Sequence, residues 1–209
     1  MSTLAIIGSG QLGQQIAHLA KQEQKFSNII FFDDFTSKKK INGYEVLGKT
    51  SEILSLYNQN FFDELIIGIG YKHMNARGEF FNKYNGTIPF ANIIHSSCII
   101  DSTVKMGSGL IIYPGCIIDK NVVLHNNILV NIGVVISHDS VIKSHSFISP
   151  RVGMAGFVKI GKQCVLGINS TIIDNITICD NVQLGGATVV IKNLKVSGLY
   201  VGNPARFIN

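Results

Sequence analysis

Residues 130–148 read VNIGVVISHDSVIKSHSFI and carry an aliphatic residue at every sixth position. The same spacing extends without a break from Ile94 to Val196. An α-helix would repeat about every 3.6 residues and a half-buried strand about every 2, so a period of six fits neither element alone. It is typical of a solenoid in which each hexad is one short strand and a turn. The pattern predicts a left-handed parallel β-helix that reaches almost to the C-terminus.

The residue two places before each aliphatic position is often small or apolar as well. Because the side chains of a strand alternate between its two faces, both residues can point into the core of the solenoid. This inward set includes Cys98, Val104, Cys116, Val122, Val134, Cys164 and Val182. We interpret these cysteines and Cys179 as small core residues, not as disulfides or zinc ligands. Unpaired cysteines fit a reducing compartment.

The first part of the chain follows a different pattern, in which short apolar strands alternate with helices. Strands are predicted at 4–7, 28–32, 45–47 and 65–69, and helices that end near residues 24, 57 and 84. This alternation indicates a small Rossmann-like α/β unit with a parallel sheet. We therefore predict two domains, an α/β domain at 1–91 and a β-helix domain with a short C-terminal tail at 92–209.

A glycine motif, GSGQLG at 8–13, follows the first strand and opens the first helix. The backbone N–H groups of such a turn can hold phosphate oxygens. Asp33 lies at the end of the second strand, where NAD-binding folds place the acid that binds ribose. A dinucleotide fold needs a second βαβ half, for which this unit is too short. A nucleotide-linked sugar is therefore favoured over the cofactor of a dehydrogenase, and glycines that serve only a tight turn remain the alternative.

Composition argues against two classes of partner. The net charge is +5, and no basic face with interleaved aromatic residues is visible, so we do not expect nucleic acid. Lys38, Lys39 and Lys40 are interpreted as a solvated loop. No apolar run is long enough to span a bilayer, and the N-terminus shows no signal peptide. We therefore expect a cytoplasmic protein that does not bind membranes.

The interior of a packed solenoid offers no pocket, so its chemistry must lie on the outside. His138 and Asp139 directly follow Ile136 and Ser137, at a predicted turn of the coil. A carboxylate beside an imidazole can accept the Nδ1–H, fix the tautomer and stabilise the imidazolium. The pair is therefore a candidate general base with its orienting acid. The other histidines show no metal spacing in the sequence.

Seven segments together resemble one known family, the hexapeptide-repeat sugar acyltransferases of the PglD/PerB/NeuD-like group. They are IIGSGQLG at 6–13, FFDD at 31–34, IGIG at 67–70, NIGVVISHD at 131–139, VLGINS at 165–170, LGGAT at 184–188 and YVGNPAR at 200–206. The resemblance implies a homotrimer in which the α/β unit holds a nucleotide-linked amino sugar. It also implies that acetyl-CoA, the co-substrate, lies in the groove between neighbouring β-helices, and that no metal is needed.

The resemblance further implies roles for individual residues. His138 matches the catalytic base of the family, Asp139 its orienting acid, and Asn131 an asparagine that lines the same site. Gly156 falls where a backbone N–H contacts the acetyl carbonyl. The remaining implied contacts are Ile168 and Gly186 for the pantetheine arm, and Gly10, Asp33, Asp34, Ile69, Gly70 and Tyr71 for the nucleotide sugar.

Two positions depart from the family pattern. Phe147 stands nine residues after His138, where the family often has a second histidine, and His145 is the nearest substitute. Tyr71 follows Gly70 where an asparagine is common. The first departure weakens a mechanism with two histidines, and the second leaves the bound nucleotide or sugar open.

The resulting hypothesis is an acetyl-CoA-dependent N-acetyltransferase. Its acceptor would be the 4-amino group of a UDP-, dTDP- or GDP-linked 4-amino-4,6-dideoxyhexose, used to make a surface polysaccharide such as O-antigen or lipopolysaccharide, or another glycan. The acetyl group would move directly, without an acyl-enzyme. Two alternatives use the same residues: O-acetylation of a sugar, as in sialic-acid O-acetyltransferases, and a non-catalytic scaffold that binds a nucleotide. The nucleotide, the C4 configuration and the C2 substituent are left open.

Overall fold

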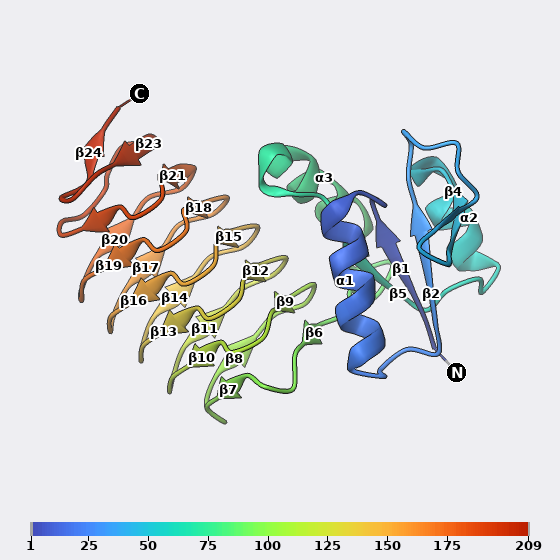
Figure 1. Ribbon diagram of the computed structural model, residues 1–209, viewed down its shortest axis with the longest axis horizontal. Coiled ribbons are helices and arrows are strands. Elements are labelled where there is room, and N and C mark those ends of the chain that lie inside the picture. The colour runs from blue at the N-terminus through green and yellow to red at the C-terminus, as the bar shows by residue number, and fades with distance from the viewer. Residues whose placement is uncertain (1, 209) are drawn as a thin grey trace. The chain divides into compact units, whose positions relative to one another are not determined.

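The computed structural model describes residues 2–208 (Figure 1). Its internal contacts separate the chain into two compact units, with the division between Ile93 and Ile94. The first unit combines a sheet with helices, and the second is a stack of short strands. Within residues 2–208, no helix is long and apolar enough to cross a membrane.

A five-stranded sheet forms the centre of the first unit, in the order β3-β4-β2-β1-β5. Both neighbours of β1 run parallel to it, and Ala5 stands in register with Ile30 and Leu65. The side chains of β1, β2 and β5 are nearly all buried, as expected for apolar strands of a parallel sheet. The five strands are β1 (Thr3–Ile7), β2 (Asn28–Phe32), β3 (Lys40–Ile41), β4 (Tyr44–Gly48) and β5 (Glu64–Ile67).

Three helices belong to the same unit: α1 (Gln11–Gln22), α2 (Ile53–Asn58) and α3 (Met74–Tyr84). Two short 3-10 turns, η1 (Thr50–Glu52) and η2 (Tyr71–His73), precede α2 and α3. α1 buries one face through residues at helical spacing, and this face includes Ile16, Ala17, Leu19 and Ala20. The helices therefore form close to where the sequence predicts them.

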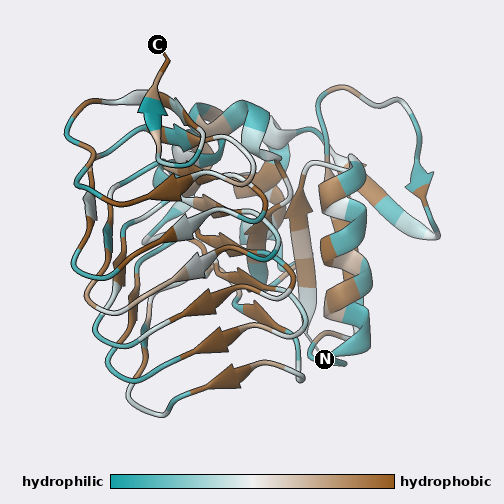
Figure 2. Ribbon diagram, turned by 60° about the vertical axis from the view of Figure 1, so that its left-hand side comes forward, coloured by the Kyte–Doolittle hydropathy of each residue, from teal (hydrophilic) through white to brown (hydrophobic). Residues whose placement is uncertain are grey.

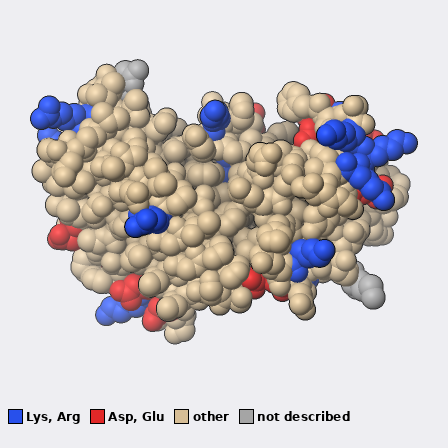
Figure 3. Space-filling view, viewed as in Figure 1, with Lys and Arg blue, Asp and Glu red and all other residues tan. Residues whose placement is uncertain are grey.

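The sheet is not wholly parallel, which corrects the prediction. β3 pairs antiparallel with β4, and the turn between them consists of Asn42 and Gly43, with φ of 49° and 84°. Asn-Gly is a strong hairpin signal because both positions need positive φ. Lys38 and Lys39 are exposed as predicted, whereas Lys40 is exposed but begins β3. Figure 3 shows lysine and arginine side chains gathered over this part of the unit.

The second unit is a left-handed parallel β-helix with three faces. Face 1 consists of β7 (Ile99–Ile100), β10 (Ile117–Ile118), β13 (Val135–Ile136), β16 (Gly153–Met154), β19 (Thr171–Ile172) and β22 (Val189–Val190). Face 2 consists of β8 (Lys105–Met106), β11 (Val123–Leu124), β14 (Val141–Ile142), β17 (Lys159–Ile160) and β20 (Thr177–Ile178). Face 3 consists of β6 (Ile93–Ile94), β9 (Ile111–Ile112), β12 (Leu129–Val130), β15 (Phe147–Ile148), β18 (Val165–Leu166), β21 (Val182–Leu184), β23 (Gly198–Val201) and β24 (Arg206–Phe207).

The six-residue period is confirmed from Ile94 to Val190. Each of these aliphatic positions is the last residue of one strand, and from Ile112 onwards they are buried. One coil takes 18 residues, because Ile118 pairs with Ile136 in the next coil of face 1. Figure 2 shows that most strands of the solenoid are hydrophobic and that polar residues concentrate in the turns. The core is therefore one continuous apolar column.

Val196 does not follow the period, which corrects the prediction at the last hexad. Its side chain is 57% exposed, and Leu194 is buried in its place. Leu194 forms the parallel bridge to Ile178, so the final coil is two residues shorter than the others. The carbonyl of Val196 instead accepts a hydrogen bond from the Tyr200 hydroxyl at 2.9 Å.

A left-handed backbone residue recurs every six positions from Gly109 to Ala187 without a gap. Each one closes the turn of its hexad, and most are glycine, asparagine or aspartate, the residues that adopt positive φ at least cost. The turns therefore have a period of six like the core.

The cysteines behave as core residues. Cys116 and Cys164 are fully buried in the inward set, Cys98 and Cys179 are partly buried, and all four are free thiols. Burial raises the pKa of the Cys164 thiol to about 12. Such a thiol stays protonated near neutral pH, which disfavours it as a nucleophile.

Candidate functional site

His138 and Asp139 stand at the corner between faces 1 and 2, directly after β13. Asp139 has a φ of 57° and takes the left-handed turn position of its hexad. Its Oδ2 lies 2.9 Å from Nδ1 of His138, and its Oδ1 accepts a hydrogen bond from Nδ2 of Asn121 at 3.0 Å. The backbone N–H of Asp139 donates to the carbonyl of Lys120. The carboxylate is therefore held by the preceding coil while it contacts the imidazole.

These contacts also set the charge of the pair. The hydrogen bond with His138, and after it the one from Asn121, holds the pKa of Asp139 below its usual value. The carboxylate is therefore ionised near neutral pH and suited to accept the Nδ1–H of the imidazole, which leaves the lone pair on Nε2. The side chains of His138 and Asp139 are 39% and 31% exposed, so a substrate can reach them.

The imidazole of His138 packs against the following coil. A Cβ added to Gly156 would stand 2.6 Å from Cε1 and 2.8 Å from Nε2 of the ring, so glycine is what leaves room for it. The ring of Phe157 meets the imidazole edge to face, with the centroids 5.2 Å apart. Among residues 2–208, none accepts a hydrogen bond from the Gly156 N–H. This donor is therefore available to a ligand beside the imidazole.

Three other predicted site residues lie at a different corner, between faces 3 and 1. Asn131 follows β12, and its Oδ1 accepts a hydrogen bond from the Ile132 N–H at 2.8 Å. Ile168 and Gly186 occupy the same corner in later coils, where a Cβ on Gly186 would stand 3.3 Å from Cγ2 of Ile168. Because the strands of face 1 separate the two corners, a single chain does not bring these residues to His138.

His145 and Phe147 also lie away from the imidazole of His138. His145 is at the corner between faces 2 and 3, where its Nδ1 lies 3.0 Å from Nδ2 of Asn127. Phe147 is a buried residue of β15. Within one chain, His145 therefore does not take the place of a second histidine beside His138.

The glycine motif closes a tight junction between β1, α1 and β5. Gly8 has a φ of 96°, and a Cβ on Gly13 would collide with the carbonyl oxygen of Gly8. A Cβ on Gly68 would stand 2.8 Å from Cα of Gly13. Gly10 is different, because its φ is −67° and an added Cβ would have no heavy atom within 4 Å. The positive φ therefore explains Gly8 and internal packing explains Gly13 and Gly68, but neither explains Gly10, which opens α1.

Asp33 holds the glycine turn in place. Its Oδ2 accepts hydrogen bonds from the N–H and hydroxyl of Ser9 at 2.8 and 2.6 Å, and its Oδ1 accepts one from the Phe35 N–H. Burial alone would raise the pKa of Asp33, but these hydrogen bonds outweigh it and the pKa is lowered. Asp34 binds the N–H and hydroxyl of Thr50 through its two carboxylate oxygens. Both acids therefore support the loop at the end of β2.

Ile69, Gly70 and Tyr71 follow β5 at the same edge of the sheet. Cγ1 of Ile69 would be 3.5 Å from a Cβ on Gly8, and Tyr71 is 47% exposed. Since β1, β2 and β5 are parallel, their carboxyl ends meet at this edge, which is where open α/β sheets bind ligands. The structure thus gathers the residues predicted to contact the nucleotide sugar.

Residues 3–84 match the family model described as the PglD N-terminal domain. The first unit is therefore similar to this domain, whose name we use for it. Curated relatives match over a shorter stretch: UDP-3-O-acylglucosamine N-acyltransferase from Bordetella pertussis is 36% identical over 61 residues, or 29% of this chain. That stretch spans only 17% of the relative's length.

Solved structures show the same fold over the whole chain. A mutant of perosamine N-acetyltransferase from Caulobacter crescentus, in complex with CoA and GDP-perosamine, has a TM-score of 0.93 at 22% identity, covering 100% of this chain and 98% of that one. The acetyltransferase domain of PglB from Neisseria gonorrhoeae FA1090, in complex with acetyl coenzyme A, has a TM-score of 0.90 at 22% identity, covering 99% of each. With the PglD N-terminal domain, this fold confirms the resemblance to the PglD- and PerB-like hexapeptide-repeat proteins.

One aromatic residue near the carboxyl end of β2 was not identified in the sequence analysis. Phe35 directly follows Asp34 and is 99% exposed. Its loop is fixed by Lys49, whose Nζ donates to the carbonyl oxygens of Asp33, Asp34 and Thr36. The sequence does not single out Phe35, because one phenylalanine in a polar loop belongs to no hydrophobic repeat.

A second missed residue is Phe157, beside His138. It stands 18 residues after Asp139, at the same turn position one coil later, and shares its left-handed conformation. A signal was present in the sequence, since a phenylalanine breaks a column of asparagine and aspartate, but it becomes visible only when turn positions are aligned coil by coil.

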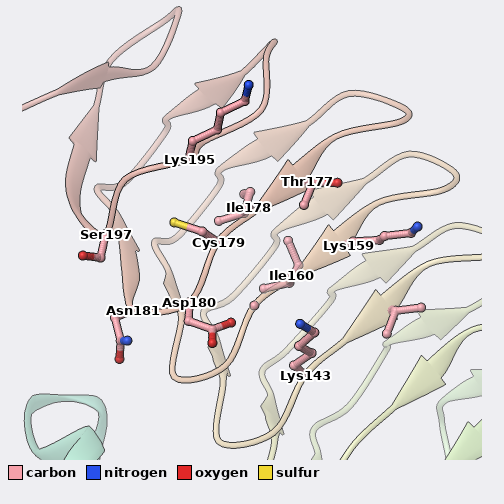
Figure 4. A pocket seen from close by; sticks show the side chains of 12 residues that line it. Lys143, Lys159, Ile160, Thr177, Ile178, Cys179, Asp180, Asn181, Lys195 and Ser197 are labelled. Atoms are coloured by element: carbon pink, nitrogen blue, oxygen red, sulfur yellow. The ribbon is translucent and has the colours of Figure 1, made fainter.

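A hollow of about 600 Å³ on face 2 lies apart from the predicted site. Figure 4 shows its lining along β14, β17 and β20, with Lys143, Lys159 and Asp180 among the polar side chains. The lining includes no histidine and none of the predicted site residues. Within residues 2–208, no three histidine, cysteine, aspartate or glutamate side chains gather as a metal site would require.

Proposed function

We propose that this protein transfers an acetyl group from acetyl-CoA to the 4-amino group of a nucleotide-linked 4-amino-4,6-dideoxyhexose. The observation that carries the proposal is the His138–Asp139 pair on the outer surface of the solenoid, with the imidazole packed against Gly156, whose N–H donates to no acceptor among residues 2–208. The PglD N-terminal domain and the shared fold support it. Two proteins of this fold were solved with CoA and GDP-perosamine or with acetyl coenzyme A, which are ligands of the same two classes.

In the proposed reaction, the amine nitrogen attacks the thioester carbon. The new N–C bond forms while the C–S bond breaks, and CoA leaves as a thiolate. Nε2 of His138 takes the proton that the amine loses, and Asp139 stabilises the resulting imidazolium. The N–H of Gly156 donates to the oxyanion that develops on the carbonyl. The proton then passes from the imidazolium to solvent or to the thiolate, which returns His138 to its starting state.

We assign nucleotide-sugar binding to residues 1–91 and acetyl transfer to 92–209. Gly10 is proposed to let a phosphate approach the N-terminus of α1, because its glycine has no internal packing role. Asp33 and Asp34 would fix the loop that faces the nucleoside, and Phe35 would stack on the base from that loop. Ile69, Gly70 and Tyr71 would contact the sugar from the end of β5. These proposed contacts do not distinguish UDP-, dTDP- and GDP-linked sugars.

We also propose a homotrimer, in which neighbouring copies would complete the site. His138 and Gly156 lie on one side of face 1, and Asn131, Ile168 and Gly186 on the other, so a neighbouring copy would supply the second set. Face 1 also carries an exposed apolar row, Ile99, Ile117 and Val135. These residues line a hollow of about 500 Å³. We propose that adjacent subunits pack against this face and hold acetyl-CoA between them. A monomeric mass in solution, with turnover retained, would contradict this arrangement.

Two other functions use the same residues. An O-acetyltransferase would employ His138 on a hydroxyl in the same way, and it differs only in the acceptor. A non-catalytic scaffold would bind the nucleotide without releasing CoA. The PglD N-terminal domain favours a nucleotide-linked acceptor over a free sugar, and the intact His138–Asp139–Asn121 contacts favour catalysis over a scaffold.

The decisive experiment measures CoA release with a thiol reagent. Acetyl-CoA is combined with UDP-, dTDP- and GDP-linked 4-amino-4,6-dideoxy sugars, and each reaction is repeated with the corresponding 4-hydroxy sugar. We expect turnover with one 4-amino sugar, and a loss of about 10²–10⁴-fold in kcat for His138→Ala, the range typical of general base catalysis.

The matched control is His125→Ala, since His125 is another exposed histidine of the solenoid and lies at a different corner. It should leave turnover unchanged. Turnover with the 4-hydroxy sugar alone would establish O-acetylation instead. No CoA release, with nucleotide-sugar binding retained, would favour the scaffold, and full activity of His138→Ala would refute the assigned base.

A further inference from the structure

Phe157 has a backbone conformation that phenylalanine rarely adopts. Its φ is 59°, in the left-handed region, where a bulky residue is a genuine outlier. The same turn position in neighbouring coils is taken by Asn121, Asp139 and Asn175, which suit this conformation. The Phe157 side chain is 50% exposed, so core burial does not explain the residue either. Long side chains also occur at left-handed turns of other corners, as at Arg151 and Gln163, but Phe157 is the one whose ring lies against His138.

The ring of Phe157 contacts that of His138. The two ring planes meet at 89° with centroids 5.2 Å apart, the edge-to-face geometry that aromatic pairs favour. The N–H of Phe157 donates to the carbonyl of His138 at 3.0 Å, so the residues are also joined through their backbones. Asp139 restrains Nδ1 of the imidazole, and Gly156 lies against the ring. Phe157 adds a further restraint that neither of these supplies.

We propose that Phe157 is a positioning residue that holds the imidazole of His138 against Gly156 in the orientation needed for acetyl transfer. This inference rests on the proposed role of His138. An unfavourable backbone conformation retained beside a reactive group is the pattern expected where geometry is kept for function. Asparagine would suit the turn better than phenylalanine. The proposal therefore predicts that a substitution which favours the turn will impair the reaction.

The variant Phe157→Asn separates the effect on the turn from the effect on the reaction. Its Tm should equal or exceed that of the wild type, because asparagine tolerates the left-handed turn. Its kcat should fall about tenfold to a hundredfold while KM for both substrates stays within about twofold, because a misplaced base affects the chemical step and not ground-state binding. Phe157→Tyr keeps the ring and should retain kcat, whereas Phe157→Leu should lose it.

The control is Gln163→Asn. Gln163 has a φ of 53° at the corner between faces 2 and 3, so asparagine favours its turn in the same way but far from the His138 ring. This variant should change neither kcat nor KM. A Phe157→Asn protein with wild-type kcat would overturn the proposal, and so would a parallel loss of kcat and Tm.

An NMR measurement tests the contact without turnover. The imidazole proton signals of His138, assigned by their loss in His138→Ala, should be displaced by the ring current of Phe157. In Phe157→Asn they should move toward the signals of the exposed His125, and in Phe157→Tyr they should not. Unmoved signals would refute the positioning role. If the wild type transfers no acetyl group, the proposed function fails, while a response of these signals would still establish that Phe157 positions His138.

Discussion

The β-helix and the PglD N-terminal domain bury their apolar residues in two different ways. In the β-helix, a core residue lies beside the equivalent residues 18 positions away in every coil but the shortened last one, as Ile118 does beside Ile136. In the N-terminal domain, neighbouring strands come from segments as distant as Leu4 and Glu64, and three glycines form the junction between them. A solenoid coil contacts mainly its neighbours, so damage should stay local. The N-terminal domain depends on a few contacts between distant segments, so damage should spread through it.

The largest effect is expected from a cavity in the solenoid. Ile148 is fully buried in β15 and pairs in register with Val130, so Ile148→Ala should lower the free energy of unfolding by about 2–5 kcal/mol. Urea denaturation measures the loss, and hydrogen exchange maps it. Protection should fall in the coils of β12, β15 and β18 and persist in the N-terminal domain.

Thr177→Ala, at an exposed position of β20, is the control and should change stability by less than about 0.5 kcal/mol. A uniform loss of protection over the whole solenoid would contradict the local character of its core.

A smaller loss is expected at the glycine junction. Gly13→Ala would drive a methyl group against the carbonyl of Gly8, at a cost of about 1–3 kcal/mol for overpacking. Hydrogen exchange should show the loss spread over β1, β2 and β5. Gly10→Ala is the matched variant, because its Cβ would meet nothing within 4 Å. It should keep the stability of the wild type while weakening nucleotide-sugar binding, as measured by calorimetry. Equal destabilisation by both substitutions would remove the distinction between the junction and the proposed phosphate contact.

The smallest effect is expected on the free energy of unfolding at acidic pH. Hydrogen bonds lower the pKa of Asp33 in the folded domain, so its ionised form stabilises the fold above about pH 3.9, the ordinary pKa of aspartate. This contribution is lost as pH falls through the lower pKa of the folded state. Asp33→Asn should therefore lower the free energy of unfolding at neutral pH. It should also make that free energy fall less steeply than in the wild type as the pH drops. Urea unfolding at a series of pH values measures both, with Asp174→Asn, an exposed residue of the β-helix, as the control. If the free energy of unfolding falls as steeply with pH in Asp33→Asn as in the wild type, Asp33 is not the source of this pH dependence.

Several features of the fold were predictable because their signals are local. Seventeen consecutive aliphatic positions from Ile94 to Val190 each end a strand of the solenoid. The strand at 28–32 was predicted with its observed bounds, since an apolar run between polar residues needs no tertiary information. The β3–β4 hairpin escaped because β3 has only two residues, although Asn42 and Gly43 marked its turn. Val196 was misplaced because the last coil is shortened to bury Leu194, and a strict period cannot register a deletion.

The sequence alone established a β-helix with a Rossmann-like unit before it, and an imidazole with its carboxylate, because periodicity and adjacency are written along the chain. Tertiary structure decided which of the predicted site residues share a corner. It placed Gly156 and Phe157 around His138 and left Asn131, Ile168 and Gly186 on the other side of face 1. It also decided that Gly8 is required by its positive φ and Gly13 and Gly68 by packing, while Gly10 is required by neither. The physical reason is that a residue's neighbours across coils and strands depend on how the backbone turns, which the spacing of residue types does not specify.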